Sequence, residues 1–224
     1  MGLDKRTTIA IRKQLLEWEN KNYRDFPWRS TQNPYEVLLA EVLLHRTRAD
    51  QVVPIYQETL KQYPDINSLA NATIGDLTKL LQALGLLWRI PLLKEMAQAI
   101  VEKFNGKIPA DTAKLEQLPG VGPYIAGATA CFAYNQPEVI LDTNTVRVLG
   151  RLTMTSVTDG SRRSKKFRNM MTSLLPEKNA RLFNFGLLDL AALICRPVSP
   201  DCMNCPLEKY CLYSETTRKA EIEA

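Results

Sequence analysis

No stretch of this sequence stays apolar for the roughly 20 residues that a membrane-spanning helix needs. The two longest apolar runs fail, because Glu41 interrupts residues 37–44 and residues 81–87 are too few. The chain opens without an export signal and contains neither an internal repeat nor a low-complexity tract. Because 224 residues with 45% hydrophobic composition can bury a core, we expect a soluble globular protein with no membrane partner.

Alternation of apolar and polar residues, which is typical of strands, is also scarce, so no parallel sheet is expected. Helical periodicity dominates instead. The first amphipathic segment, around residues 9–18, should end in the polar segment 19–24. The sequence therefore predicts an all-α protein. Further helices are expected at residues 34–45, 49–62, 74–84, 90–104, 112–117, 124–134, 143–152, 165–175 and 180–194.

Cysteine is almost absent before the last thirty residues, where only Cys131 occurs, in an apolar run that makes it a small core residue. The other four follow the pattern C-x6-C-x2-C-x5-C, which fits a four-thiolate metal site in a reducing cytoplasm or nucleoid. Disulfides would close few useful loops in so short a segment. Spacing alone does not separate zinc from an iron–sulfur cluster. The four residues are Cys195, Cys202, Cys205 and Cys211.

The chain has only a small excess of positive over negative charge. The 29 Lys and Arg residues against 24 Asp and Glu residues give a net charge of +5, which suits a polyanionic partner without requiring one. The one dense basic run, at residues 161–166, is either a solvated face or a phosphate contact.

The most specific internal segment is the hairpin Leu118-Pro119-Gly120-Val121-Gly122-Pro123-Tyr124, in which two glycines precede an expected helix. Glycine permits a tight turn and a close approach to a ligand, and the first N–H groups of a helix can bind a phosphate. Gly120, Val121 and Gly122 therefore predict contact with a nucleic-acid backbone. An ordinary glycine-rich turn between two helices is the alternative.

Asp142 follows three large apolar residues and precedes Thr143, as expected of a residue that caps the start of a helix. A capping role would fully account for an isolated aspartate. The carboxylate of such a cap can nevertheless face a ligand, so the two roles are compatible.

The hairpin, Asp142 and the four-cysteine tail occur in the order typical of the helix-hairpin-helix DNA glycosylases, which the sequence resembles over nearly its whole length. Other segments resemble the branch that contains MutY adenine glycosylases and Mig-type thymine-DNA mismatch glycosylases. These segments are Phe26-Pro27-Trp28-Arg29, Asn33-Pro34-Tyr35, residues 41–47 and residues 183–189.

The resemblance implies a [4Fe-4S] cluster on the four cysteines and two helical lobes with a DNA-facing cleft between them. A helical barrel with the hairpin would occupy residues 28–139, and residues 1–27 and 140–224 would form the cluster lobe. It also implies a monomer that acts on double-stranded DNA containing a mismatched or damaged base.

The resemblance assigns catalysis to Asp142, whose negative charge would stabilise the positive charge that develops on the sugar. Glu41, an acid in an otherwise apolar helix, would protonate the departing base. The alternative for Glu41 is a carboxylate that faces solvent on an amphipathic helix. Tyr124 stands where strand-cleaving relatives have a lysine and MutY enzymes commonly a serine, and tyrosine is typical of Mig-like thymine glycosylases. Packing of its ring is the plainer reading.

Three further residues are candidates for DNA contact. Leu86 stands where MutY enzymes tend to have tyrosine and could fill the gap beside a flipped base, although it could also be a core leucine. His45 and Arg46 could reach the orphaned guanine. Pro123 departs from the basic residue common in relatives, which weakens one expected phosphate contact.

The sequence thus favours a monofunctional glycosylase that acts on T or U opposite G. One alternative is a MutY-type adenine glycosylase, against which we weigh the lack of the usual C-terminal domain beyond Cys211. A second alternative is a DNA-binding module without catalysis.

Overall fold

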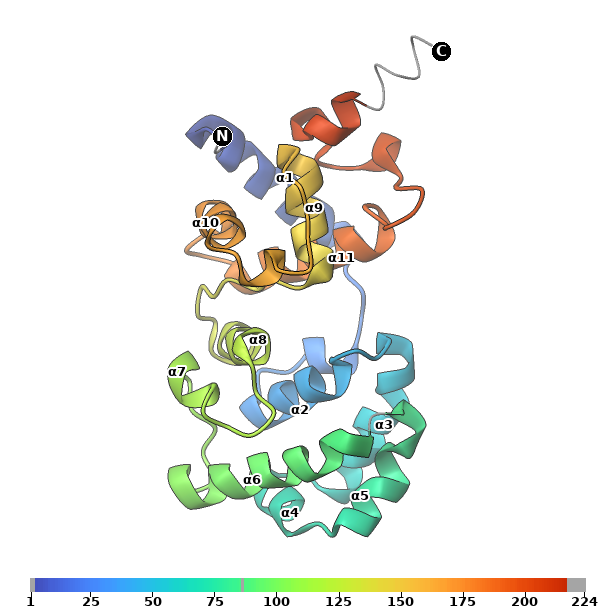
Figure 1. Ribbon diagram of the computed structural model, residues 1–224, viewed down its shortest axis with the longest axis vertical. Coiled ribbons are helices and arrows are strands. Elements are labelled where there is room, and N and C mark those ends of the chain that lie inside the picture. Colours follow the sequence, from blue (N-terminus) through green and yellow to red (C-terminus); the bar gives the residue numbers. More distant parts are fainter. Residues whose placement is uncertain (1–2, 86, 217–224) are drawn as a thin grey trace. The chain divides into compact units, whose positions relative to one another are not determined.

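The computed structural model describes residues 3–85 and 87–216, and these form helices and connecting turns without a β-strand (Figure 1). The all-α prediction is confirmed. The chain divides into two compact units: Asp25–Gln136, and Met1–Arg24 together with Pro137–Ala224. Within the described ranges, no helix is both long enough and apolar enough to cross a bilayer.

In the unit Asp25–Gln136, every α-helix except α3 begins at a side-chain cap or at proline. Asn33 caps the first helix ahead of Pro34, and Asp65, Thr73 and Asp111 each accept a hydrogen bond from the first turn of a later helix. Its α-helices are α2 (Pro34–Leu44), α3 (Ala49–Gln62), α4 (Ile66–Asn71), α5 (Ile74–Leu81), α6 (Ile90–Phe104), α7 (Thr112–Leu115) and α8 (Pro123–Tyr134).

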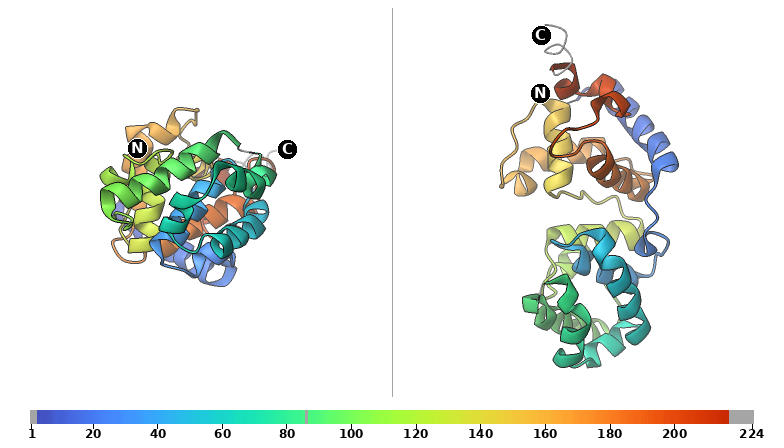
Figure 2. Two further views of the ribbon diagram at one scale, coloured as in Figure 1. Left: turned by 90° about the horizontal axis from the view of Figure 1, so that it is seen from below. Right: turned by 90° about the vertical axis from the view of Figure 1, so that its right-hand side faces the viewer.

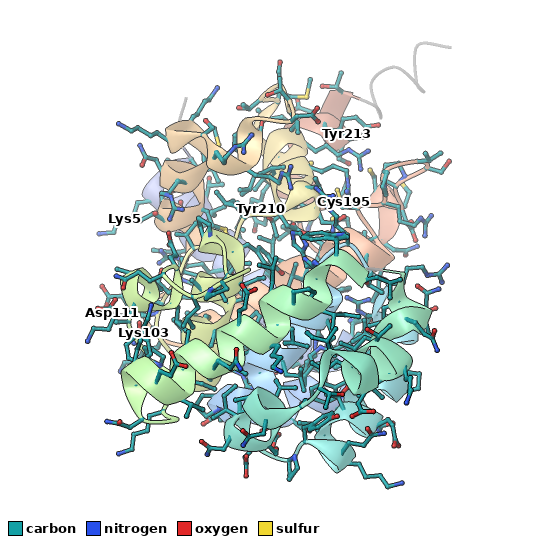
Figure 3. All side chains as sticks on the ribbon, turned by 60° about the horizontal axis from the view of Figure 1, so that its bottom comes forward. Lys5, Lys103, Asp111, Cys195, Tyr210 and Tyr213 are labelled. Atoms are coloured by element: carbon teal, nitrogen blue, oxygen red, sulfur yellow. The ribbon has the colours of Figure 1, made fainter. Side chains whose placement is uncertain are left out.

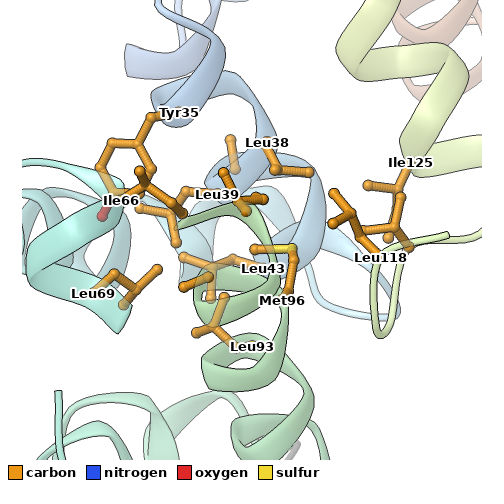
Figure 4. Packing of buried hydrophobic residues seen from close by; sticks show 14 of the residues in the cluster. Tyr35, Leu38, Leu39, Leu43, Ile66, Leu69, Leu93, Met96, Leu118 and Ile125 are labelled. Atoms are coloured by element: carbon orange, nitrogen blue, oxygen red, sulfur yellow. The ribbon is translucent and has the colours of Figure 1, made fainter. Parts of the chain in front are cut away.

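The core of this unit lies around α2, which packs against α3 and α8. Figure 4 shows leucines of α2 beside Leu69 of α4 and Leu93 of α6. Leu38 and Leu39 of α2 and Leu69 of α4 are fully buried. Leu93 and Met96 of α6 are almost fully buried. The α8 segment is buried from Ile125 to Ala133, and Cys131 within it has no exposed surface, which confirms the prediction of a core residue. Helix α2 is thereby buried along most of its length, including Glu41.

The other unit contains α1 (Lys5–Asn22), α9 (Thr143–Thr153), α10 (Lys165–Leu174) and α11 (Ala180–Leu193). Helix α1 lies alongside α11, although they are far apart in sequence (Figure 2). As predicted, the first helix ends within the polar segment 19–24, at Asn22, although Glu19 of that segment is fully buried. A Cβ atom added to Gly186 would lie 3.1 Å from the Cβ of Glu19, so the two helices approach closely there.

Candidate functional site

Asp142 begins α9, and its carboxylate is held by the first turn of that helix. The backbone N–H groups of Asn144 and Thr145 donate to Oδ1 at 2.9 and 2.7 Å, and Nδ2 of Asn144 donates to Oδ2 at 2.8 Å. The backbone N–H of Asp142 donates in return to Oγ1 of Thr145 at 2.8 Å, which completes a capping box. The predicted capping role is confirmed. The half-buried carboxylate therefore has a fixed orientation.

Arg147 connects this helix start to the cysteine segment. Its Nη1 donates to Oδ1 of Asn144 at 3.0 Å, its Nε donates to the carbonyl of Cys195 at 3.0 Å, and its Nη2 donates to the carbonyl of Ala191 at 2.9 Å. A continuous set of hydrogen bonds thus runs from the Asp142 carboxylate through Asn144 and Arg147 to Cys195. Burial lowers the pKa of the Arg147 guanidinium.

Arg151, one helical turn further along α9, holds the same segment. It donates to the carbonyls of Arg196 and Pro197 at 2.6 and 3.0 Å, and its Nη1 lies 3.4 Å from the Cys195 sulfur. Its guanidinium also packs over the ring of Tyr213, 5.0 Å from the ring centre. Figure 3 labels Cys195 and Tyr213. The sequence analysis missed both arginines. Their spacing of four places them on one face of α9, but nothing in the sequence shows which segment covers that face.

The four tail cysteines are unpaired, half-buried thiols. Burial, together with the nearby thiols of Cys211, Cys195 and Cys202, raises the pKa of Cys205 to about 12. Within residues 3–85 and 87–216, no three His, Cys, Asp or Glu side chains are arranged to hold a single metal ion. Four free thiols, of which that of Cys195 lies 3.4 Å from the Arg151 guanidinium, are a donor set that fits an anionic thiolate-bound group.

The hairpin residues form the turn between α7 and α8. Gly120 has φ of +74°, a left-handed conformation that favours glycine, and a Cβ added to Gly122 would meet no atom within 4 Å. Val121 is 6% exposed, and its backbone N–H donates to the carbonyl of Leu118 at 3.1 Å within the turn. The ring of Tyr124, in the first turn of α8, is half-buried and packs against the core.

Glu41 is 4% exposed, so the alternative of a solvent-facing carboxylate on α2 is wrong. His45 caps the C-terminal end of the same helix, and Arg46, which is exposed, follows with a left-handed φ of 62°. Because α2 packs against α8, Glu41 and Tyr124 come from neighbouring helices. Leu86 lies outside the described residues. Trp88, which follows it after Leu87, is 58% exposed.

Comparison with known proteins identifies a family and relatives. A model of the HhH-GPD superfamily base excision DNA repair protein matches residues 39–174. A thymine-DNA glycosylase of Aeropyrum pernix is 38% identical, with 94% of this chain and 97% of that protein covered. A thymine/uracil-DNA glycosylase of Pyrobaculum aerophilum is also 38% identical, with 88% of each covered. An adenine DNA glycosylase of Buchnera aphidicola subsp. Baizongia pistaciae is 31% identical, with 92% of this chain and 58% of that protein covered.

Solved structures have the same fold. A thermostable thymine-DNA glycosylase superposes with a TM-score of 0.87 at 31% identity, covering 94% of this chain and 98% of that one. An endonuclease III in a non-covalent DNA complex superposes with a TM-score of 0.83 at 21% identity, covering 97% and 99%.

Proposed function

The chain belongs to the HhH-GPD superfamily of base excision DNA repair proteins, and we propose that it is a DNA glycosylase that removes thymine or uracil paired with guanine. The observation that carries this proposal is Tyr124 in the first turn of the helix behind the hairpin. A phenol cannot form the Schiff base with which a lysine would cleave the strand, so the enzyme is monofunctional. The thymine and thymine/uracil glycosylases at 33–38% identity support the same substrate.

In the proposed reaction the mispaired nucleotide leaves the helix stack, which costs least for a mismatch. As the glycosidic bond breaks, positive charge develops on the sugar, and the carboxylate of Asp142 stabilises it. A water molecule then adds to the sugar carbon and loses a proton, which leaves an abasic site. Three N–H donors hold that carboxylate in one orientation, so little rearrangement precedes the reaction. Glu41 supplies the proton that the departing base requires.

The four cysteines would hold a [4Fe-4S] cluster, whose contribution would be to fold the loop from Cys195 to Cys211 against α9. The positive charges of Arg147 and Arg151, which bind this loop through its carbonyls, offset the negative charge of four thiolates. The hairpin glycines present backbone N–H groups to a DNA phosphate. We further propose that the enzyme acts as a monomer in the cytoplasm, on nucleoid DNA.

Adenine removal opposite guanine or 8-oxoguanine is the second candidate. The adenine glycosylases at 31–34% identity favour it.

Single-turnover reactions on duplexes with T/G, U/G, A/G and A/8-oxoguanine pairs test the proposal, each quenched with and without hot alkali. We expect release of T and U, with strand breaks only after alkali. Adenine release in place of thymine would establish the second candidate, and breaks without alkali would refute the monofunctional assignment.

A further inference from the structure

Arg89 binds the C-terminal end of α2 although 44 residues separate it from His45. Its Nη1 donates to the carbonyls of Val42 and His45 at 2.8 and 2.9 Å, and its Nη2 donates to Nδ1 of the His45 ring. Burial lowers the pKa of this guanidinium. Arg89 lies at the start of α6, so these bonds join two elements of the same unit.

The chemistry of the two side chains fixes the protonation of His45. A guanidinium carries only donors, so Nδ1 of His45 must accept and therefore bears no proton. The imidazole is then neutral, and its single proton lies on Nε2. Among the described residues, no side chain or carbonyl forms a hydrogen bond with Nε2. His45 is half-buried, so this N–H is a donor that the protein itself leaves available.

The backbone beside His45 is constrained by the same arginine. Arg46 has a left-handed φ of 62°, which costs a residue with a side chain about 1 kcal/mol. The carbonyl that Arg89 binds at 2.9 Å belongs to the peptide bond immediately before Arg46. Arg89 thus stabilises the unfavourable turn as well as the ring that precedes it.

We propose that Arg89 is a positioning residue that holds His45 as a neutral Nε2–H donor for a hydrogen-bond acceptor of bound DNA. The inference rests on the proposed function as a DNA glycosylase and assigns Arg89 a role in substrate binding. The acceptor is O6 of the unpaired guanine or a phosphate oxygen, since both accept from a neutral imidazole.

The ring state can be measured directly because His45 is the only histidine in the chain. We expect two-bond proton–nitrogen correlation spectra of the iron-loaded protein near pH 7.5 to show one Nε2–H tautomer. In Arg89→Gln the signal should shift toward a mixture of tautomers. An Nδ1–H tautomer in the unaltered protein would overturn the proposal, and that result does not depend on whether a variant folds.

A double-mutant cycle tests whether Arg89 acts through His45. We expect Arg89→Gln to weaken binding to a duplex with an abasic-site analogue opposite guanine about tenfold, or about 1.4 kcal/mol. In a His45→Ala background the same change should cost less than about twofold. Equal losses in both backgrounds would overturn the proposal. If Arg89→Gln does not fold, Arg89→Lys replaces it.

Arg48→Gln is the matched control, because that side chain is 78% exposed and pairs with Asp50 rather than with His45. It removes the same charge and should leave the tautomer unchanged, so a tautomer shift in this variant would refute the assignment to Arg89.

Replacing the opposite guanine by 2-aminopurine removes O6 and distinguishes the two acceptors. If 2-aminopurine weakens duplex binding by the unaltered protein but not by His45→Ala, the acceptor is O6 of the guanine. If His45→Ala instead makes duplex affinity less dependent on salt concentration, the acceptor is a phosphate. A neutral His45 with no effect on either measurement would refute the DNA contact. If no thymine is released but the tautomer and the cycle hold, only the proposed function fails.

Discussion

The two candidate acids are held in opposite ways, one in each unit. Asp142 is half-buried and accepts hydrogen bonds from the first turn of its own helix, and Asn144 and Arg147 extend that set to Cys195. Glu41 is 4% exposed, in a helix whose neighbours Leu38 and Leu39 are fully buried. Hydrogen bonds from its own helix therefore fix the orientation of Asp142, whereas the packing of the helices around α2 buries Glu41.

This difference matches the two tasks of glycosidic bond hydrolysis. A group that must stay negative beside a developing cation benefits from N–H donors that favour the charged form. A group that must deliver a proton benefits from an environment with little water. We therefore expect substitutions at the two acids to differ in size and in their effect on folding.

The largest effect is expected for Asp142→Asn. Asparagine is also a good helix cap, so the start of α9 should persist while the negative charge is lost. We expect base release under single-turnover conditions to fall about 10³-fold or more, about 4 kcal/mol, with duplex affinity nearly unchanged. The control is Asp111→Asn, which alters the cap of α7 and should leave the rate unchanged. A rate that survives in Asp142→Asn would remove this residue from the mechanism.

Removal of one cysteine tests whether the tail cysteines hold a cluster that stabilises the protein. We expect Cys205→Ser to lose iron and acid-labile sulfide and to lower the free energy of unfolding by about 3 kcal/mol or more. Thermal denaturation and metal analysis check this. Cys131→Ala is the matched control, because that cysteine is buried in α8 and should retain the metal. Full iron content in Cys205→Ser would contradict the proposed cluster.

Glu41→Gln keeps the shape of the buried side chain and removes its proton-donating role. We expect base release to slow about 10²-fold, with a thermal midpoint close to that of the unaltered protein. Glu36→Gln, in the first turn of the same helix, is the control and should change the rate less than about twofold. Equal rates in the two variants would assign Glu41 to packing alone.

The same comparison explains what the sequence reveals. The Asp142 cap and the cysteine spacing are local patterns, so both could be read from a few adjacent residues. The burial of Glu41 and Glu19 could not be predicted in this way, because in each case a helix distant in sequence covers the face that carries the glutamate. The contact between Arg89 and His45 could not be predicted either, because 44 residues separate them.

Helix α4 shows a different limit. It has six residues, too few for a periodicity to stand out, although its capping box of Asp65 and Ser68 is visible in the sequence.

Whether the basic run at residues 161–166 contacts a phosphate remains a prediction. The side chains of Arg162 and Arg163 within it are exposed.

The smallest effects are expected in the hairpin, where two glycines separate stability from DNA binding. Gly120→Ala forces a side chain into a left-handed conformation, with its Cβ 3.3 Å from that of Leu92, and should lower the free energy of unfolding by about 1 kcal/mol. Gly122→Ala meets open space and should cost about 0.5 kcal/mol, as expected for alanine at a helix cap.

If the hairpin approaches a phosphate through its backbone, however, the added methyl group of Gly122→Ala occupies the space that the DNA needs. Its duplex affinity should then fall several-fold more than its stability explains, and urea denaturation with binding titrations on the same samples measures both quantities. Affinity losses that simply follow stability in the two variants would show that Gly122 serves the turn alone. The DNA contact would then have to come from side chains such as His45 and Arg46 at the end of α2.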